Sequence, residues 1–310
     1  MKKLLYFVFI FLLALFVLTG CKNSETASGD DKKDDTIVVG TKYHTESYIL
    51  SKITALYLKD KGYQIEEAGQ MGGQLSRKAL ENDQIDLYWD YTGTALVTYL
   101  KQDTISDPKQ AYEKLAKIDK EKNDIIWLSP AAFNNTFALL LKEEKAKELG
   151  IETISDLAAY VNQNPGKLTF ATNAEFASRP DGLKGIEKEY GFKFGSKNVK
   201  KMETGLPIQA LSNGEVDVAV AYSTDGRIKA YNLKALKDDK TFFPAYNGMV
   251  TTRADVLQQH PNLEKELKPI VDKLDDETIT NLNYQVDFEK KSVEEVAKNW
   301  LLQNGFIKSK

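Results

Sequence analysis

From Thr36 onward, short runs of β-branched and apolar residues alternate with longer amphipathic stretches. The runs predict strands over 36–40, 63–67, 85–89, 168–172 and 216–222. Apolar residues at helical spacing predict helices over 45–62, 75–81, 107–122, 183–190 and 208–211. The last sixty residues, from Thr251, predict only helices. This alternation indicates an α/β fold.

The second half of the chain repeats part of the first. Residues 78–92 match residues 209–223 at one constant offset, which pairs Tyr91 with Tyr222. The match indicates an internal duplication of a helix–strand unit, with chance similarity between two such units as the alternative. In a duplication, each half places a tyrosine just past the carboxyl end of a core strand, where open α/β sheets bind ligands. Two such halves facing each other would enclose a cleft.

The N-terminal segment has the layout of a secretory signal. Two lysines precede an apolar run from Leu4 to Leu18, which is short for a membrane span. The run ends in Leu-Thr-Gly-Cys, which resembles a bacterial lipobox, and Cys21 is the only cysteine in the chain. We therefore expect residues 1–20 to be a lipoprotein signal peptide, and residues 21–35 to be a lipidated (palmitoylated) cysteine and a polar, flexible tether. The alternative is a signal anchor, or an ordinary signal with a chance cysteine.

Composition excludes several classes of protein. The 310 residues are 42% hydrophobic and 28% charged, which is enough to bury the core of one large domain or two smaller ones. The net charge of -3 does not indicate a nucleic-acid-binding protein. One cysteine and two histidines allow no internal disulfide, no CxxC pair and no multi-histidine metal site. The chain also lacks a P-loop and a GxSxG motif, so we expect no metal, no cofactor and no enzymatic activity, although some two-lobed α/β proteins are enzymes.

Six motifs together resemble one known family. They are GTKYHTESYIL (40–50), DYTGTAL (90–96), FNNTFAL (133–139), RPDGLKG (179–185), AYSTDGRIKAYNL (221–233) and FFPAY (242–246). In this order they resemble the substrate-binding proteins of osmoprotectant ABC importers, which bind glycine betaine, choline, carnitine and related quaternary amines. The resemblance implies a type II periplasmic-binding-protein fold with a ligand cleft between two α/β lobes. Lobe 1 would comprise residues 36–132 and 247–310, and lobe 2 residues 133–246 with the two hinge crossovers.

A quaternary ammonium group carries spread positive charge and has no N–H to donate. The faces of aromatic rings are suited to it, because they offer a negative quadrupole together with apolar contact. The resemblance places Tyr91, Phe137, Tyr222 and Tyr246 in such an aromatic cage. The family commonly has tyrosine at the position of Phe137, so this chain keeps the ring and loses one hydroxyl. Each of these residues could instead serve the core, to which we assign Trp89.

A zwitterionic ligand also needs a partner for its carboxylate. The resemblance places Lys42, which precedes a predicted helix N-terminus, and Arg179 on opposite sides of the cleft. Lys42 could instead be solvated, and Arg179 could be paired with Glu175 or Asp181.

Two further polar contacts complete the predicted site. Thr94 is a candidate hydroxyl donor, and the backbone of Asn135 a candidate partner for the ammonium end. We assign Asp225 and Arg227 to turn structure and lobe packing.

These observations predict a lipid-anchored solute-binding protein on the extracytoplasmic face of the cell membrane. It would capture a quaternary-ammonium osmoprotectant, with glycine betaine favoured, and deliver it to the permease and nucleotide-binding subunits of an ABC transporter. Choline, carnitine or another small cation are alternative ligands. A surface adhesin or a ligand sensor with a membrane partner would share the same anchor and remains an alternative function.

Overall fold

The structure is a computed structural model and describes residues 35–308. These residues form two sheets, and the first has the strand order β2-β1-β3-β10-β4. Its strands are β1 (Thr36–Lys42), β2 (Gln64–Met71), β3 (Leu87–Tyr91), β4 (Ile125–Trp127) and β10 (Gly248–Arg253). β1 runs parallel to β2 and β3, whereas β10 runs antiparallel to β3 and β4. β3 therefore lies at the centre of this sheet.

The second sheet has the order β7-β6-β8-β5-β9. Its strands are β5 (Phe137–Lys142), β6 (Phe170–Thr172), β7 (Val199–Lys201), β8 (Val218–Tyr222) and β9 (Leu233–Ala235). β6 runs parallel to β7 and β8, whereas β5 runs antiparallel to β8 and β9. The two sheets thus share one topology, and β8 has the place in the second sheet that β3 has in the first.

The repeated sequence unit performs the same structural task in both sheets. Just before β3, the carboxylate of Asp86 accepts a hydrogen bond from the backbone N–H of Val38 at 2.7 Å. Just before β8, the carboxylate of Asp217 accepts one from the backbone N–H of Thr169 at 2.8 Å. Each aspartate thereby ties the central strand to its parallel neighbour. The predicted repeat is confirmed as a repeat of structure.

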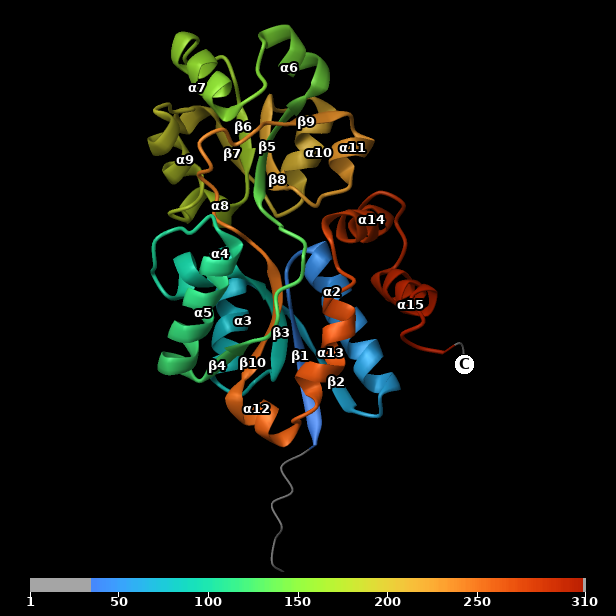
Figure 1. Cartoon of the computed structure of the whole chain (residues 1–310). Helices are drawn as coiled ribbons and strands as arrows, with labels where there is room; N and C mark the ends of the chain where they lie inside the picture. Colours follow the sequence, from blue (N-terminus) through green and yellow to red (C-terminus); the bar gives the residue numbers. More distant parts are fainter. Residues whose placement is uncertain (1–34, 309–310) are drawn as a thin grey trace, which may run out of the picture. The chain divides into compact units, whose positions relative to one another are not determined.

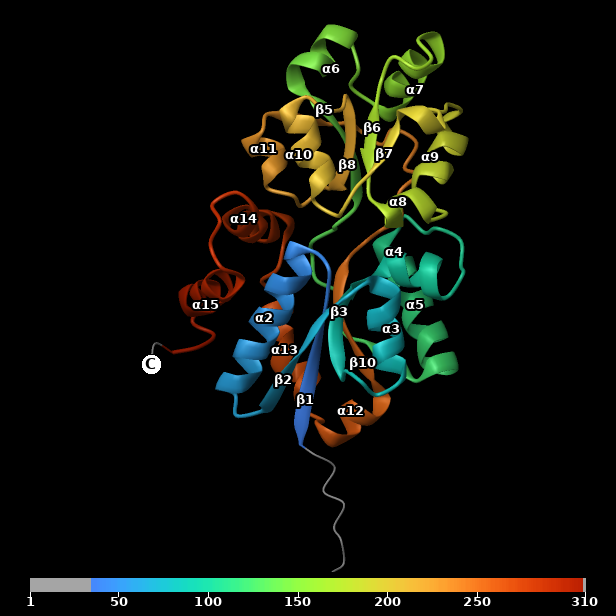
Figure 2. The same cartoon turned by 180° about the vertical axis from the view of Figure 1, so that it is seen from behind.

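Helices cover both faces of each sheet, and each sheet with its helices forms a lobe (Figures 1 and 2). The helical segments of the first lobe are α2 (Thr45–Asp60), α3 (Gly73–Glu81), α4 (Thr92–Thr94), the π-helical turn η1 (Ala95–Tyr99), α5 (Pro108–Asn123), α12 (Ala254–Gln259), α13 (Leu263–Val271), α14 (Asp276–Asp287) and α15 (Val293–Gln303). Those of the second lobe are α6 (Glu143–Leu149), α7 (Ile154–Gln163), α8 (Ala174–Ser178), α9 (Leu183–Tyr190), the 3₁₀ turn η2 (Ser196–Asn198), α10 (Leu206–Asn213) and α11 (Arg227–Ala230). The predicted α/β fold is confirmed.

The chain passes between the lobes twice, from β4 to β5 and from β9 to β10. These two crossovers lie side by side, because Asn134 and Asn247 form an antiparallel bridge and Asn135 N–H donates to the carbonyl of Tyr246 at 3.1 Å. The predicted limits of lobe 2, residues 133–246, fall within the crossovers and stay a prediction.

One strand corrects the prediction from sequence. Residues 251–253 were expected to be helical, but they belong to β10, which lies between β3 and β4. Val250 of this strand pairs with Trp89, and the pairing supplies the hydrogen bonds that a short β-branched run cannot make alone. Trp89 is fully buried, as predicted, and its Nε1 donates to Thr54 Oγ1 at 2.9 Å.

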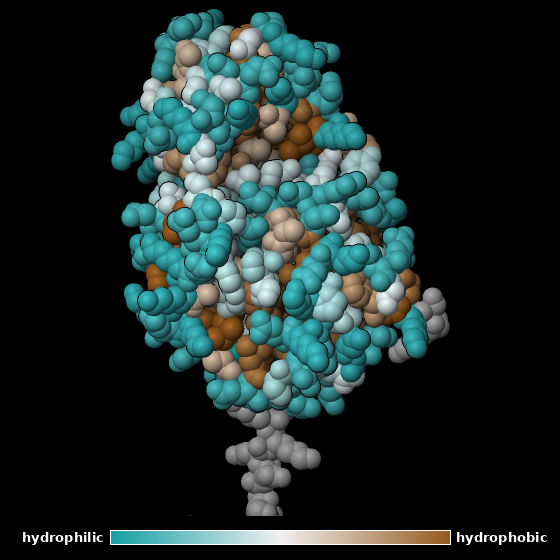
Figure 3. Space-filling model, in the orientation of Figure 1, coloured by the Kyte–Doolittle hydropathy of each residue, from teal (hydrophilic) through white to brown (hydrophobic). Residues whose placement is uncertain are grey.

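The face of the molecule shown in Figure 3 is mostly hydrophilic, and its hydrophobic patches are small. Within residues 35–308, no helix combines the length and the apolar character needed to cross a membrane. The predicted signal peptide, the lipidated Cys21 and the tether up to residue 34 lie outside the described residues.

Candidate functional site

The four aromatic residues of the predicted cage meet where strands of both lobes end. Tyr91 and Tyr222 are the last residues of β3 and β8, and Phe137 begins β5, next to Tyr222 in the sheet. The ring centroid of Phe137 lies 5.3 Å from that of Tyr222 and 5.5 Å from that of Tyr246. All four side chains line one cavity of about 520 Å³, which we call the cage cavity.

The cage cavity also contains the four polar residues predicted for the site. These are Lys42 from the end of β1, Thr94 from α4, Asn135 from the first crossover and Arg179 from the end of α8. The structure therefore brings together all eight residues named from the sequence. Their contact with a ligand stays a prediction, since the cavity by itself shows only their convergence.

The Lys42 ammonium is already paired with a buried carboxylate. Its Nζ lies 2.7 Å from Asp90 Oδ1, and the hydroxyls of Tyr88 and Tyr99 donate to the other oxygen at 2.7 and 2.9 Å. The same Nζ lies 4.6 Å from the ring centroid of Tyr91, within the range of a cation–π contact. A ligand carboxylate would thus meet a lysine whose charge is balanced inside the protein.

Arg179 uses all five of its N–H groups within the protein. Nε and Nη2 donate to Asp181 at 2.8 and 2.6 Å, and Nη1 donates to Thr94 at 3.2 Å and to Glu175 at 3.0 Å. Nη2 also donates to the hydroxyl of Tyr246 at 3.2 Å. Burial alone would lower the pKa of Arg179, but its hydrogen bonds with Asp181 raise that pKa, so the guanidinium stays charged. The alternative that Arg179 pairs with Glu175 or Asp181 is confirmed.

Glu46, in the first turn of α2, is a candidate that the sequence analysis missed. It is only 3% exposed, and its Oε1 accepts hydrogen bonds from the Tyr91 hydroxyl and Asn135 Nδ2, both at 2.6 Å. Its Oε2 accepts from Thr224 Oγ1 at 2.7 Å and from Asn283 Nδ2 at 3.1 Å. Burial raises the pKa of the Glu46 carboxyl, and these four hydrogen bonds offset part of that rise. The carboxylate thus joins both lobes, the first crossover and α14.

His44 is a second residue that the sequence did not reveal as part of the site. Its ring centroid lies 5.9 Å from that of Tyr91 and 5.6 Å from that of Tyr222. Its Nδ1 accepts the backbone N–H of Ser47 at 3.3 Å, which caps α2 and assigns the proton of the neutral imidazole to Nε2. Burial, and then the charge of Lys42, lower the pKa of His44 to about 3. At neutral pH its ring is therefore uncharged.

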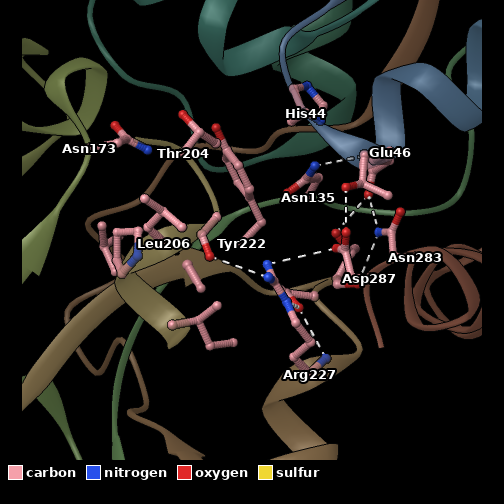
Figure 4. Close-up of a pocket in the computed structure, with 18 of the residues that line it drawn as sticks. His44, Glu46, Asn135, Asn173, Thr204, Leu206, Tyr222, Arg227, Asn283 and Asp287 are labelled. Atoms are coloured by element: carbon pink, nitrogen blue, oxygen red, sulfur yellow. Dashed lines mark hydrogen bonds and ion pairs between the residues drawn. The ribbon is translucent and has the colours of Figure 1, made fainter. Parts of the chain in front are cut away.

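A smaller cavity of about 240 Å³ adjoins the cage cavity, and we call it the side pocket. The residues shared by the two are His44, Asn135, Phe137, Thr204 and Tyr222. Figure 4 shows Glu46, Asn135 and Asn283 grouped on one side of the side pocket, with Arg227 at the bottom of the view.

Arg227 and Asp225 form an ion pair, with Nη2 of Arg227 2.6 Å from Asp225, and both residues line the side pocket. Their assignment to turn structure and lobe packing stays a prediction. Within residues 35–308, no group of three or more histidine, cysteine or acidic side chains is arranged to hold a metal ion.

Two α/β lobes of one topology, adjacent crossovers and a ring-lined cavity at the strand ends define a two-lobed solute-binding protein. The substrate-binding domain of ABC-type glycine betaine transport systems matches residues 35–303. The chain belongs to this family.

Individual relatives agree with this assignment. The glycine-betaine-binding protein of Pseudomonas aeruginosa is 39% identical over 278 residues, which cover 88% of this chain and 89% of the relative. The carnitine transport binding protein OpuCC of Listeria monocytogenes is 33% identical over 310 residues, which cover 97% and 98% of the two chains. A crystal structure described as a glycine betaine/carnitine/choline ABC transporter matches with a TM-score of 0.72 at 33% identity, covering 87% of this chain and 99% of that chain. The predicted family, the two-lobed fold and the role of a substrate-binding protein in an ABC importer are confirmed.

Proposed function

We propose that this protein captures a quaternary-ammonium compound in the cage cavity and delivers it to an ABC permease. The observation that carries the proposal is the convergence of Tyr91, Phe137, Tyr222 and Tyr246 from both lobes on one cavity. Ring faces attract a cation that has no hydrogen to donate, and they do so most strongly away from water. The relatives named for glycine betaine and carnitine support the same ligand class.

Within this class we propose glycine betaine as the preferred ligand. Its carboxylate would approach Arg179, whose Nη1 is held by Thr94 and by Glu175, a side chain that is 49% exposed. These two partners are the easiest for a ligand carboxylate to displace, whereas Asp181 is fully buried and binds Arg179 through both oxygens. Choline and carnitine remain the rival ligands.

The remaining parts of the proposal concern location and partners. Cys21 would carry a lipid, including palmitate, and residues 22–35 would link the lipid to the lobes at the extracytoplasmic face of the cell membrane. The permease and nucleotide-binding subunits of the importer would be the protein partners. A lipid-anchored ligand sensor is the alternative, and co-purification with a permease separates the two.

Calorimetry of residues 22–310 against glycine betaine, carnitine, choline, proline and glutamine tests the ligand class. We expect saturable binding of quaternary amines, with glycine betaine bound more tightly than choline, and no binding of glutamine. Failure of every quaternary amine to bind would refute the proposal.

Arg179→Ala tests the orientation of the ligand. Removing Arg179 leaves Asp181 buried without its partner, so both ligands should lose affinity through a disturbed site. Glycine betaine should lose about 2 kcal/mol more than choline, because only glycine betaine has a carboxylate to pair with the guanidinium. Equal losses for the two ligands would show that Arg179 does not contact the carboxylate.

A further inference from the structure

Within residues 35–308, one buried carboxylate of the cleft, that of Glu46, has no cationic partner. The other acids that are buried or nearly so there have one, since Asp90 pairs with Lys42, Asp181 with Arg179, and Asp225 with Arg227. Among residues 35–308, Glu46 forms hydrogen bonds only with neutral groups and has no ion pair with lysine, arginine or histidine.

Four hydrogen bonds hold the Glu46 carboxylate in place but do not cancel its charge. They come from two hydroxyls and two amides, which are dipoles and not cations. A buried ion that is hydrogen-bonded but unpaired remains costly, and a cation brought nearby would lower that cost. The site is thus organised around a negative charge that the described part of the chain does not balance.

The position of Glu46 directs this charge toward the cage cavity. Two of its four partners, Tyr91 and Asn135, line that cavity, and Glu46 itself lines the adjoining side pocket. The Tyr91 hydroxyl donates to the carboxylate at 2.6 Å, which makes the Tyr91 ring richer in electrons and its face more attractive to a cation.

We infer that Glu46 is the counter-ion of the ligand's quaternary ammonium group, an inference that rests on the function proposed above. The ammonium nitrogen is surrounded by methyl groups and cannot accept or donate a hydrogen bond. Glu46 therefore attracts it electrostatically, through the negative charge of its carboxylate across the Tyr91 ring, and not by direct contact. The rings shape the cavity and supply the nearby attraction. Glu46 makes the site selective for a positive charge over a neutral group of equal shape.

A matched pair of ligands measures this selectivity directly. In 3,3-dimethylbutanoate a carbon atom replaces the nitrogen of glycine betaine, so shape and carboxylate are kept while the positive charge is lost. Choline and 3,3-dimethylbutan-1-ol form a second pair, which lacks the carboxylate and so leaves out Arg179. The measured quantity is the ratio of the two dissociation constants in each pair, obtained by calorimetry or by competition on the full chain.

We expect Glu46→Gln to reduce the preference for the charged member of each pair by about tenfold, which equals about 1.4 kcal/mol. Glu187→Gln is the matched control, because Glu187 is a half-buried carboxylate that accepts the backbone N–H of Phe194 and lines neither cavity of the site. This control should keep the preference of the unmodified protein.

A purely structural role for Glu46 predicts a different result. In that case Glu46→Gln would weaken the charged and neutral ligands by the same factor, and the inference would be overturned. Should Glu46→Gln fail to fold, Glu46→Ser is the second variant, because it leaves space for water molecules that can accept the four hydrogen bonds. A reduced preference for the charged ligand would again support the inference, and equal weakening of both ligands would again overturn it. If the unmodified protein binds neither quaternary amine, the proposed function fails instead, so the two failures are distinguishable.

Discussion

The two tyrosines of the repeat present equivalent rings but different hydroxyl groups to the cage cavity. The Tyr91 hydroxyl donates to Glu46, and burial followed by the charge of Glu46 raises its pKa, so it stays protonated. The Tyr222 hydroxyl makes no hydrogen bond with any residue between 35 and 308, and its ring stacks on Phe137. The ring should therefore account for the contribution of Tyr222, whereas the hydroxyl should also matter at Tyr91.

Substitutions at these two positions should separate ring from hydroxyl. Each ring facing a desolvated cation contributes about 1–2 kcal/mol, so Tyr222→Ala should weaken the binding of a quaternary amine about tenfold or more. Tyr222→Phe should change affinity less than about twofold, whereas Tyr91→Phe should cost several-fold because it removes a donor from buried Glu46. Calorimetry with one quaternary amine measures the affinity of each variant. Equal losses of affinity for Tyr222→Phe and Tyr222→Ala would contradict the prediction that the ring of Tyr222 accounts for its contribution.

His44 makes the stability of the folded protein depend on pH, and its lowered pKa gives the direction of this dependence. Its pKa falls from about 6.5 when exposed to about 3 in the folded state, so between these values the unfolded chain binds more protons. Its contribution therefore makes the folded state less stable as the pH falls from about 6.5 toward 3. The raised pKa of Glu46 acts in the opposite direction, because that carboxyl takes up a proton more readily when folded.

His44→Asn isolates the histidine contribution. Asparagine can still cap α2, since its side-chain oxygen can accept the backbone N–H of Ser47. Urea unfolding at pH 7 and pH 5 should show that the variant loses about 2 kcal/mol less than the unmodified protein between these two pH values. An identical loss in both proteins would mean that His44 is not held neutral by its surroundings.

At the scale of elements, the sequence predicted the central strands β3 and β8 and their parallel neighbours β1 and β6, but not their antiparallel neighbours β10 and β5. The pattern that ends in Tyr91 and Tyr222 predicted β3 and β8, and it also predicted that both tyrosines would meet at a cleft. β4, β5, β7, β9 and β10 were not predicted as strands, because short runs such as 137–142 become strands only through pairing with residues far away in the chain.

The residues missed in the site have a similar explanation. An acidic residue in the first turn of a helix is ordinary, because it stabilises the helix dipole, so nothing in the sequence distinguished Glu46. Its partners Asn135, Thr224 and Asn283 come from three distant segments, and only folding brings them to one carboxylate.

α14 touches both lobes near the site. From the first lobe, Thr45 donates to Asp287 at 2.6 Å, and from α14 Asn283 Nδ2 donates to the carbonyl of Thr224 in the second lobe at 3.1 Å. The turn before α11 packs so closely on this helix that a Cβ atom added to Gly226 would lie 2.4 Å from Tyr284 Cβ. The close packing of α14 against the second lobe therefore requires a glycine at position 226.

Gly226→Ala should loosen the packing of α14 on the second lobe. The backbone of Gly226 has an ordinary φ of −58°, so the cost comes from the clash alone and should be about 1–3 kcal/mol of unfolding free energy. Gly69→Ala is the control, since an added Cβ there meets nothing within 4 Å. Chemical denaturation compares the two. Equal stabilities would show that the contact with Tyr284 yields without cost.

At the scale of the whole molecule, side chains link the two lobes across the cleft. Glu46 of the first lobe accepts from Thr224 of the second at 2.7 Å, and Arg179 of the second donates to Thr94 of the first at 3.2 Å. Both links lie beside residues of the cage cavity, so opening the cleft breaks them. A ligand that contacts Tyr91 and Tyr222 together favours the arrangement in which the lobes meet, because it binds that arrangement better than an open one.

The proposed lipid anchor should be separable from ligand binding. If Cys21 carries the lipid, Cys21→Ala should shift most of the protein from the membrane fraction to the soluble extracytoplasmic fraction, because a polar tether alone does not hold it to the bilayer. Affinity for glycine betaine should stay within about twofold, since all residues of the cage cavity lie between Lys42 and Tyr246, well beyond the tether. Fractionation of cells followed by immunoblotting measures the first result and calorimetry the second.

Ser24→Ala is the control, because it changes a nearby tether residue and leaves the cysteine in place. Retention of Cys21→Ala in the membrane would show that the N-terminal apolar segment itself anchors the protein.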